Sequence, residues 1–339
     1  MKTYLLPEKG KFYKANLHSH STFSDGKLTP QQIKEEYMKK GYSVVAYTDH
    51  DLLIPHQELT DENFVALNGY EIGFCEIYES VPYEFCKQCH VVLIGLDKDN
   101  VYQPLFLEKR HAPYNTKYID LVKSEGTPRI LDKWYSPSCI SFTMETARKK
   151  GFYVIYAHPT WSLESYNQYV NYNGMHAVEI VNGCVNHGFD DVNPRVYDEL
   201  LRSGKKISCI ATDDNHNTCP IDSPYTTSFA GFTMIKADKL EYNTITKAMV
   251  DGNFYCSQGP EIYELYIEDG KLVVKCSDAQ RINVNYAGRL AQTKVMEDAP
   301  VTEAEFELSN KHGYFRVTVI GLDGKRAFTN AYYPEDYNI

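Results

Sequence analysis

The chain has 339 residues, of which 24% are charged, and its formal net charge is −10. Its length predicts about two domains, and its acidic balance disfavours a nucleic-acid-binding protein, which usually carries a basic face. No apolar stretch reaches the roughly 18 residues of a transmembrane helix, and nine cysteines without an apolar signal segment at residues 1–11 predict a reduced, cytoplasmic protein.

Apolar, strand-like runs alternate with helix signals along the first three-quarters of the chain. We expect strands at 12–17, 43–47, 64–70, 91–96, 152–157, 177–181 and 207–211. The first helix is expected to begin at Thr29-Pro30 and to end at Gly41, and later helices at about 141–150, 194–203 and 238–251. This alternation is typical of an α/β barrel. The segment at about 97–140 interrupts it and is long enough to form a lid over a site.

Histidines and carboxylates cluster where these strands end. The clusters are His18-Ser19-His20, Thr48-Asp49-His50-Asp51, Glu71, His158-Pro159 and Asp214-Asn215-His216. A barrel brings such positions to one rim, and residues i and i+2 of a strand share a face. Imidazoles and carboxylates gathered in this way are typical ligands of divalent metals. Burying these polar groups without a metal would cost roughly several kcal/mol for each group.

The motifs resemble those of the PHP (polymerase and histidinol phosphatase) metallohydrolases. Asn16-Leu17-His18-Ser19-His20 with Asp25 resembles the first motif, and Thr48-Asp49-His50, Ala157-His158-Pro159 and Asp214-Asn215-His216 are similar to the later ones. The resemblance covers roughly residues 12–255. It implies a distorted (β/α)7 barrel that carries two or three Mn, Fe or Zn ions.

The resemblance also implies a ligand set. The nine residues are His18, His20, Asp25, His50, Glu71, His90, His158, Asp214 and His216. One metal would be held by His18, His20, Glu71 and Asp214, a second by Glu71, His90 and His158, and a third by Asp25, His50 and His216. A carboxylate at Asp25 slightly favours Mn or Fe over Zn, because it is a harder ligand than histidine.

His90 precedes its apolar run instead of following it, so we expect residues 72–89 to leave the rim and return antiparallel. The run Cys86-Lys87-Gln88-Cys89-His90 also matches the attachment pattern of c-type haem, but that attachment normally requires export. A structural zinc on Cys75, Cys86 and Cys89 is a further alternative, which lacks an evident fourth ligand.

The mechanism predicted from the metals needs no protein nucleophile. Water held between two divalent ions can lose a proton near neutral pH, and the bridging hydroxide would attack the ester. We expect Asp49, Asp51 and Asp213 to orient ligands, with Asp213 also a candidate proton shuttle. Arg129, Asn182 and His187 are candidate substrate contacts, chosen by residue type and position.

From about residue 255 the pattern changes to short β-strands, expected at 261–267, 271–277, 281–287, 303–308 and 314–320. We therefore predict a barrel domain over 1–254 and a small β-sandwich-like domain over 255–339, an arrangement that resembles the carbaryl-hydrolase-like branch of the family. The predicted function is hydrolysis of a small phosphate ester. Hydrolysis of a carbamate or carboxylic ester is the alternative, and a metal-binding or carbohydrate-binding protein without catalysis is the alternative outside enzymes. The sequence predicts neither a nucleic-acid nor a membrane partner, and it leaves the oligomeric state open.

Overall fold

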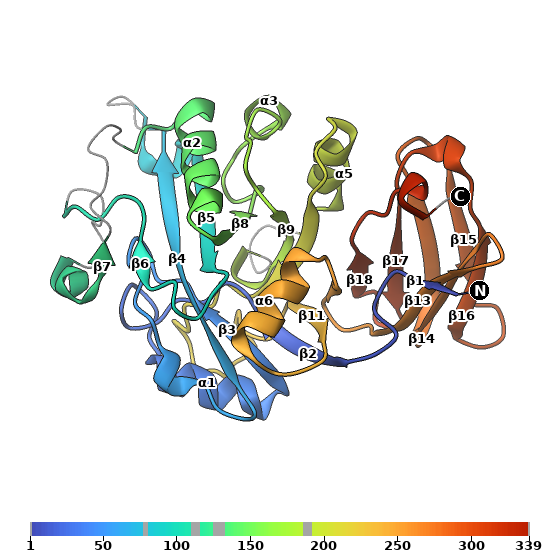
Figure 1. Ribbon diagram of the computed structural model, residues 1–339, viewed down its shortest axis with the longest axis horizontal. Helices are drawn as coiled ribbons and strands as arrows, with labels where there is room; N and C mark the ends of the chain where they lie inside the picture. Colours follow the sequence, from blue (N-terminus) through green and yellow to red (C-terminus); the bar gives the residue numbers. More distant parts are fainter. Residues whose placement is uncertain (1, 77–80, 110–115, 125–132, 186–191, 338–339) are drawn as a thin grey trace.

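The computed structural model describes residues 2–76, 81–109, 116–124, 133–185 and 192–337. It is a mixed α/β structure whose large sheet joins sixteen of the described strands (Figure 1). In the first part of the chain the order across the sheet is β11 (Phe232–Ala237), β2 (Lys11–Asn16), β3 (Tyr42–Tyr47), β4 (Val65–Cys75), β5 (Gln88–Gly95), β8 (Phe152–Ala157), β9 (Ala177–Asn182) and β10 (Ser208–Thr212). All seven strands expected there are present, with bounds that differ by a few residues.

The first crossover follows the local signals in the sequence. β2, β3 and β4 are parallel neighbours, and α1 (Pro30–Lys39) connects β2 to β3. Thr29 caps the helix in a capping box with Gln32, which satisfies amide groups that the first turn leaves without partners. Ile33 and Tyr37 are fully buried, so this face of the helix packs on the sheet.

β5 runs antiparallel to both of its neighbours. It pairs antiparallel with β4 on one side and with β8 on the other, and His90 lies opposite Gly73 and Ala157. The antiparallel return expected from the position of His90 is therefore present. It brings a residue near the start of β5 to the rim at which β8 ends.

The carboxyl ends of strands far apart in sequence meet at this rim. Ser19 and Asn215 form a parallel bridge, and the amide of Asp214 donates to the carbonyl of His18 at 3.0 Å. Below them, the Thr233 hydroxyl donates to the carbonyl of Ala211 at 3.0 Å and so joins β11 to β10. β10 and β11, which lie at opposite ends of the strand order given above, are thus neighbours in space. The loops after β2 and β10 therefore lie side by side.

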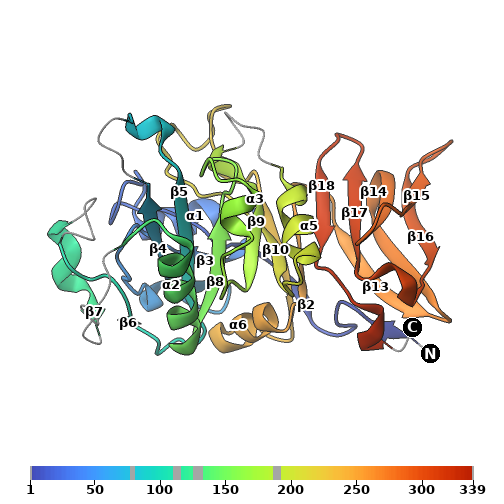
Figure 2. The same ribbon diagram turned by 90° about the horizontal axis from the view of Figure 1, so that it is seen from above.

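Further helices are α2 (Pro137–Lys149), α3 (Tyr166–Tyr169), α5 (Pro194–Arg202) and α6 (Tyr242–Val250). α2 begins four residues earlier than predicted because Ser136 caps it and Pro137 occupies its first turn. Figures 1 and 2 show α2, α3 and α5 along one side of the sheet. None of the described helices is both long and apolar enough to cross a bilayer.

The C-terminal part consists of strands and short 3-10 helices among its described residues. The strands are β12 (Phe254–Ser257), β13 (Ile262–Glu268), β14 (Lys271–Tyr286), β15 (Ala291–Val295), β16 (Val301–Glu307), β17 (Phe315–Gly321) and β18 (Arg326–Thr329). β14 is one strand of 16 residues where two had been predicted. Its pairing registers shift near Ala279, so the interval between the two predicted strands is an irregularity within one strand.

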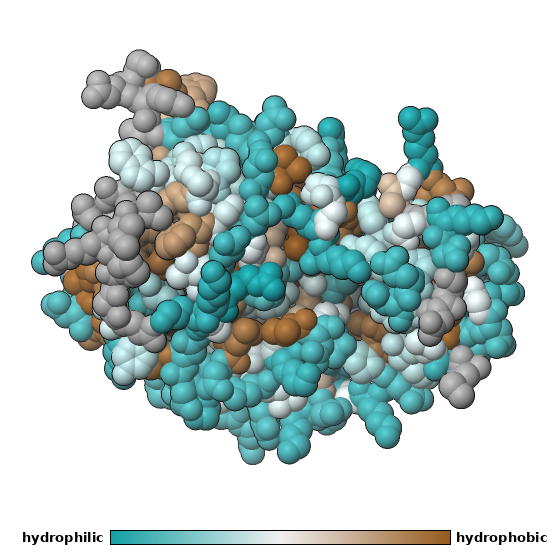
Figure 3. Space-filling model, turned by 45° about the horizontal axis from the view of Figure 1, so that its top comes forward, coloured by the Kyte–Doolittle hydropathy of each residue, from teal (hydrophilic) through white to brown (hydrophobic). Residues whose placement is uncertain are grey.

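The C-terminal strands have an apolar cluster of their own but continue the large sheet. That cluster includes Leu265, Val274, Ile282 and Val317, together with Leu6 from the start of the chain. β12 pairs with β11 and with β18, so the boundary predicted at 254/255 coincides with the start of a shared strand. Both ends of the chain lie in this part (Figure 1). The face drawn in Figure 3 is mostly hydrophilic, and its apolar side chains form small separate groups.

Candidate metal centre

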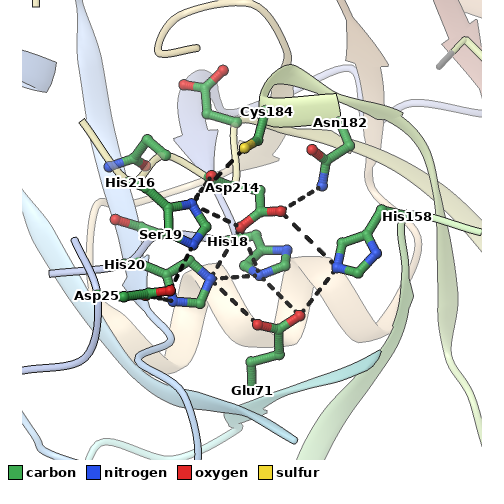
Figure 4. Close-up of polar contacts among 12 residues, drawn as sticks. His18, Ser19, His20, Asp25, Glu71, His158, Asn182, Cys184, Asp214 and His216 are labelled. Carbon is green, nitrogen blue, oxygen red and sulfur yellow. Dashed lines mark hydrogen bonds and ion pairs between the residues drawn. The ribbon is translucent and has the colours of Figure 1, made fainter. Parts of the chain in front are cut away.

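All nine predicted ligands converge at the rim of the sheet. His18, His20 and Asp25 come from the segment after β2, His50 follows β3, Glu71 lies in β4, His90 lies in β5, His158 follows β8, and Asp214 and His216 follow β10. Their donor atoms form four overlapping groups, each with all atoms within 4.8 Å of one another: His20, Asp25, His50 and His216; His18, His20 and Asp214; His18, Glu71 and His158; His50, Glu71 and His90. Figure 4 shows most of these side chains pointing toward one another.

Glu71 lies at the centre of the cluster. Its Oε1 is 2.8 Å from Nδ1 of His90 and 3.2 Å from Nε2 of His158. Its Oε2 is 3.0 Å from Nδ1 of His50 and 3.3 Å from Nε2 of His20. Oε1 also lies 3.4 Å from Nε2 of His18. The two carboxylate oxygens thus face different sets of imidazoles, which is the arrangement a carboxylate needs in order to bridge two metal ions.

Asp214 provides the second shared carboxylate. Its Oδ1 lies 3.0 Å from Nε2 of His20 and 3.3 Å from Nε2 of His18, yet it is buried without a hydrogen bond of normal geometry. The two imidazole nitrogens are themselves only 3.1 Å apart. Three donor atoms that converge at this spacing around a carboxylate oxygen without a hydrogen bond fit a cation between them.

Asp25 closes the cluster on its outer side. Its carboxylate is 39% exposed, whereas Glu71 is 1% exposed. Asp25 Oδ2 lies 3.4 Å from Nε2 of His216 and 3.7 Å from Nε2 of His50. The third predicted group is therefore assembled at the solvent-facing edge, and His20 joins it.

The ring nitrogens that face away from the cluster have partners of their own. Nδ1 of His18 lies 2.8 Å from Glu179, Nε2 of His90 lies 3.1 Å from Oε1 of Gln88, and Nδ1 of His216 lies 2.9 Å from the carbonyl of Asp214. Each partner can accept the ring N–H, so in the neutral imidazole the opposite nitrogen has its lone pair directed into the cluster. Metal-binding histidines are typically oriented in this way, so the donor set fits divalent metal ions.

Burial and charge act in opposite directions on the groups of this cluster. Burial opposes protonation of His18, but Asp214, Glu71 and Glu179 outweigh it and raise its pKa well above the usual value. Burial likewise opposes ionisation of Glu71 and Asp214, yet the surrounding histidines hold the pKa of both below the usual range. Burial lowers the pKa of His90 to about 4. The carboxylates are thus ionised at neutral pH, as metal ligands must be.

The structure places the three predicted orienting aspartates differently from one another. Asp49 accepts hydrogen bonds from Ser21 and from the hydroxyl of Ser24, at 2.7–2.8 Å, and so holds the loop between His20 and Asp25.

The Asp51 carboxylate pairs with Lys133 at 2.6 Å, and among the described residues no hydrogen bond or ion pair joins it to a ligand side chain. The Asp213 carboxylate accepts from the Tyr37 hydroxyl and from the amides of residues 229–231, at 2.7–3.0 Å. Because Asp213 is buried and fully hydrogen-bonded, it anchors a loop and does not fit the role of a proton shuttle.

Of the three predicted substrate contacts, only Asn182 lies in the described residues. Its NH2 group donates to Glu179 at 3.0 Å and to Asp214 at 3.3 Å, and its carbonyl accepts from the amide of Val185 at 3.1 Å. Asn182 is fully buried and holds the carboxylates in place, so its amide is not available to substrate. Arg129 and His187 lie outside the described residues.

The described part of the segment at 97–140 supports the ligand loops. Tyr118 stacks edge-on against Phe23 at 4.8 Å, and Val122 packs in a small apolar cluster with Leu52 and Ile54. These contacts lie beside the loops that carry Asp25 and His50. None of the described residues of this segment lines the cavity above the metal centre.

Sequence reasoning missed Glu179 and Trp161. Glu179 is buried in β9 and reaches His18, while Trp161 packs its ring edge-on against His90 and His158, at 5.1 and 5.0 Å between centroids. A single charged residue within the apolar run 177–181 was the available signal for Glu179. Nothing comparable marked Trp161, which lies in a turn after β8.

The cysteine alternatives receive no support from the described residues. None of the four ligand groups found there contains a cysteine, and His90 belongs to the His and carboxylate cluster. All nine cysteines are free thiols.

Comparisons with known proteins gave structural neighbours only. No family model and no curated protein sequence matches the chain. A two-domain protein of Bacteroides vulgatus containing a predicted PHP-like metal-dependent phosphoesterase superposes with a TM-score of 0.45 at 16% identity, covering 97% of this chain and 98% of the other. A predicted metal-dependent phosphoesterase of Bifidobacterium adolescentis gives a TM-score of 0.40 at 17% identity, covering 65% and 93%. An amidohydrolase of Chromobacterium violaceum gives 0.39 at 17% identity, covering 60% and 87%.

Proposed function

We propose that this protein is a metal-dependent hydrolase of small phosphate esters, built on two or three divalent ions, Mn, Fe or Zn. The observation that carries the proposal is the convergence of six imidazoles and three carboxylates at one rim. In three of the histidines the ring nitrogen that faces away from the cluster is held by a hydrogen-bond acceptor. His18, His20, Glu71 and Asp214 would hold one ion, and Glu71 would share the others with the remaining histidines and Asp25.

When bound, the ions would act as Lewis acids that activate water and polarise the phosphoryl oxygens. The three carboxylates of the set neutralise only part of the charge of two or three divalent ions, so the site would attract an anionic ester. Cys184 also lines the cavity, with its Sγ 3.9 Å from Nδ1 of His216. That nitrogen already faces the Asp214 carbonyl at 2.9 Å, so it is not available as a base to activate the thiol.

The experiment is metal-dependent turnover. The purified protein is stripped with chelator, restored separately with Mn, Fe or Zn, and assayed with p-nitrophenyl phosphate, bis-p-nitrophenyl phosphate, a naphthyl carbamate and a naphthyl acetate. Hydrolysis of the phosphate esters that depends on added metal supports the proposal. Preference for the carbamate or acetate would favour the alternative esterase, and tight metal binding without turnover would favour a non-catalytic metal-binding or carbohydrate-binding protein.

We also propose the finer architecture, a PHP-type (β/α)7 barrel over 1–254 followed by a β-sandwich-like domain over 255–339, as in the carbaryl-hydrolase-like branch. The alternation of strands and helices before residue 254 and the separate apolar cluster after it support this division. The nine free thiols fit a reducing cytoplasm.

A further inference from the structure

We infer that the metal centre selects small phosphate esters whose alcohol or phenol half is uncharged and carries an apolar or aromatic group. The inference rests on the proposed function and adds a substrate class to it. It comes from the walls of the cavity above the metal ligands, which the metal chemistry alone does not explain.

The cavity is a single hollow of about 410 Å³ whose floor is formed by the metal-ligand side chains. This volume is near the lower end of the roughly 300–1,000 Å³ typical of small-molecule sites, so the space fits a small ester. Its walls are formed by Tyr83, Trp161, Cys184, Val185, Thr218 and Thr227. The walls therefore combine two aromatic rings, a valine, a thiol and two hydroxyl groups.

Trp161 forms the part of the wall that packs against two of the proposed ligand histidines. Its indole lies about as close to the ring of His90 as to the ring of His158, at 5.1 and 5.0 Å between centroids. A ring nitrogen of each of these two histidines contacts Oε1 of Glu71, at 2.8 Å for His90 and 3.2 Å for His158. The organic half of a phosphate ester bound at Glu71 would thus lie against an aromatic side chain, where apolar and aromatic groups gain the most from burial.

Tyr83 and Val185 extend this surface outward. Val185 is 5% exposed and lies inside the cavity wall. Tyr83 is 53% exposed, so it lies at the mouth of the cavity and is not part of the hydrophobic core. Tyr83 belongs to the short 3-10 helix Tyr83–Phe85, which lies between β4 and β5. A ring at the rim can cover an apolar substituent that reaches out of the cavity.

The described wall residues offer no cation to a second anionic group. Among the described residues that line the cavity, none is lysine or arginine. The nearby cation Lys133 is paired with Asp51 at 2.6 Å and does not line it. The ions would take up the reacting phosphoryl group, but a second phosphate on the same substrate would meet, among the described wall residues, neutral side chains and the Asp25 carboxylate. Desolvating a charge without a partner is costly, so such substrates should be rejected.

The test compares benzyl phosphate, ethyl phosphate and ethylene glycol bisphosphate with the metal-loaded enzyme, by release of inorganic phosphate. Their alcohols have similar acidity, so differences in kcat/KM report binding by the walls. We expect benzyl phosphate to exceed each of the other two by about tenfold or more, the scale on which apolar pockets discriminate.

Two variants sharpen the comparison. Tyr83→Ala should lower the ratio of kcat/KM for benzyl over ethyl phosphate, whereas Tyr263→Ala, which removes a similarly exposed tyrosine (48%) on β13, should leave that ratio unchanged. Thr218→Lys adds a cation to the wall and should raise the ratio for the bisphosphate over benzyl phosphate. Turnover with no preference for benzyl phosphate, or with preference for the bisphosphate, overturns the inference alone. Absence of metal-dependent turnover for all three esters overturns the proposed function and the inference with it.

Discussion

Replacing Glu179 by glutamine is expected to weaken metal binding although Glu179 is not itself a predicted ligand. Its Oε1 accepts from Nδ1 of His18 and from the Thr212 hydroxyl, both at 2.8 Å, and its Oε2 accepts from the amide of His158 at 2.9 Å and from Asn182 at 3.0 Å. All four partners are donors, and only a carboxylate offers acceptors on both sides. Glutamine would place its own NH2 group against one of these pairs.

The magnitude follows from the contact with His18. A hydrogen bond to a charged group contributes about 1.5–3 kcal/mol, and each 1.4 kcal/mol is about tenfold in affinity, so metal affinity should fall roughly 10- to 100-fold. The unfolding free energy should fall by a similar amount. Because small proteins are typically stable by about 5–15 kcal/mol, the variant should remain folded.

The assay is titration of chelator-stripped protein with Mn²⁺, followed by calorimetry and by elemental analysis after dialysis. Glu145→Gln, at an exposed position on α2, is the matched control and should bind metal as the parent does. A folded Glu179→Gln protein with the parent affinity and the parent metal content would show that Glu179 does not act through His18.

Three further changes test the site and its supports. Glu71→Gln should release at least one ion, since both oxygens of Glu71 face ligand histidines, and full metal occupancy in the purified variant would contradict the bridging role. Lys133→Met should lower the unfolding free energy by about 3–5 kcal/mol, because it leaves the Asp51 carboxylate, which is 3% exposed, without its cation. Denaturant unfolding measures the loss, and adding Asp51→Asn should restore part of it; purely additive losses would count against the pairing. Truncation after residue 254 keeps all nine ligands but removes β12 from the edge of β11, so the fragment should aggregate. A soluble, fully metallated and active fragment would show that the C-terminal strands are dispensable for both folding and chemistry.

The elements and the ligand positions could be predicted because both depend on local sequence. Apolar runs of five to seven residues marked the buried strands, and the histidines and carboxylates stood close to where those runs end, except for His90, which precedes its run. The capping residue Thr29 likewise marked where the first helix begins. A parallel arrangement then brings strand ends to one rim whatever the loops contain.

Long-range features were not predictable from the same signals. The pairing of β12 with β11 joins the C-terminal strands to the large sheet, and no periodicity in either strand encodes its neighbour. β14 continues through a stretch where two strands had been expected, with a register shift near Ala279 between them. The composition of residues 97–140 suggested a lid, but composition does not reveal which surface a segment packs against.

The strain in the backbone explains why the supporting residues matter. Asp51, His158 and Asp214 have φ angles of 59°, 27° and 50°, the left-handed region that non-glycine residues rarely adopt, and each lies just beyond a strand. Such conformations cost on the order of 1–3 kcal/mol each and persist only where the surroundings impose them.

Each of these strained residues is held by a specific buried contact. The amide of Asp51 donates to the Glu71 carbonyl at 2.7 Å, the amide of His158 donates to Glu179 at 2.9 Å, and the amide of Asp214 donates to the His18 carbonyl at 3.0 Å. The left-handed turn breaks the alternation of the strand before it, which allows the side chains of consecutive strand ends to face one point. Glu179 therefore has two functions at the rim, because it orients the ring of His18 and holds the strained backbone of His158. Removing it should disturb two proposed ligands at once, which is why its replacement is a more sensitive test of the assembled centre than replacement of a single histidine.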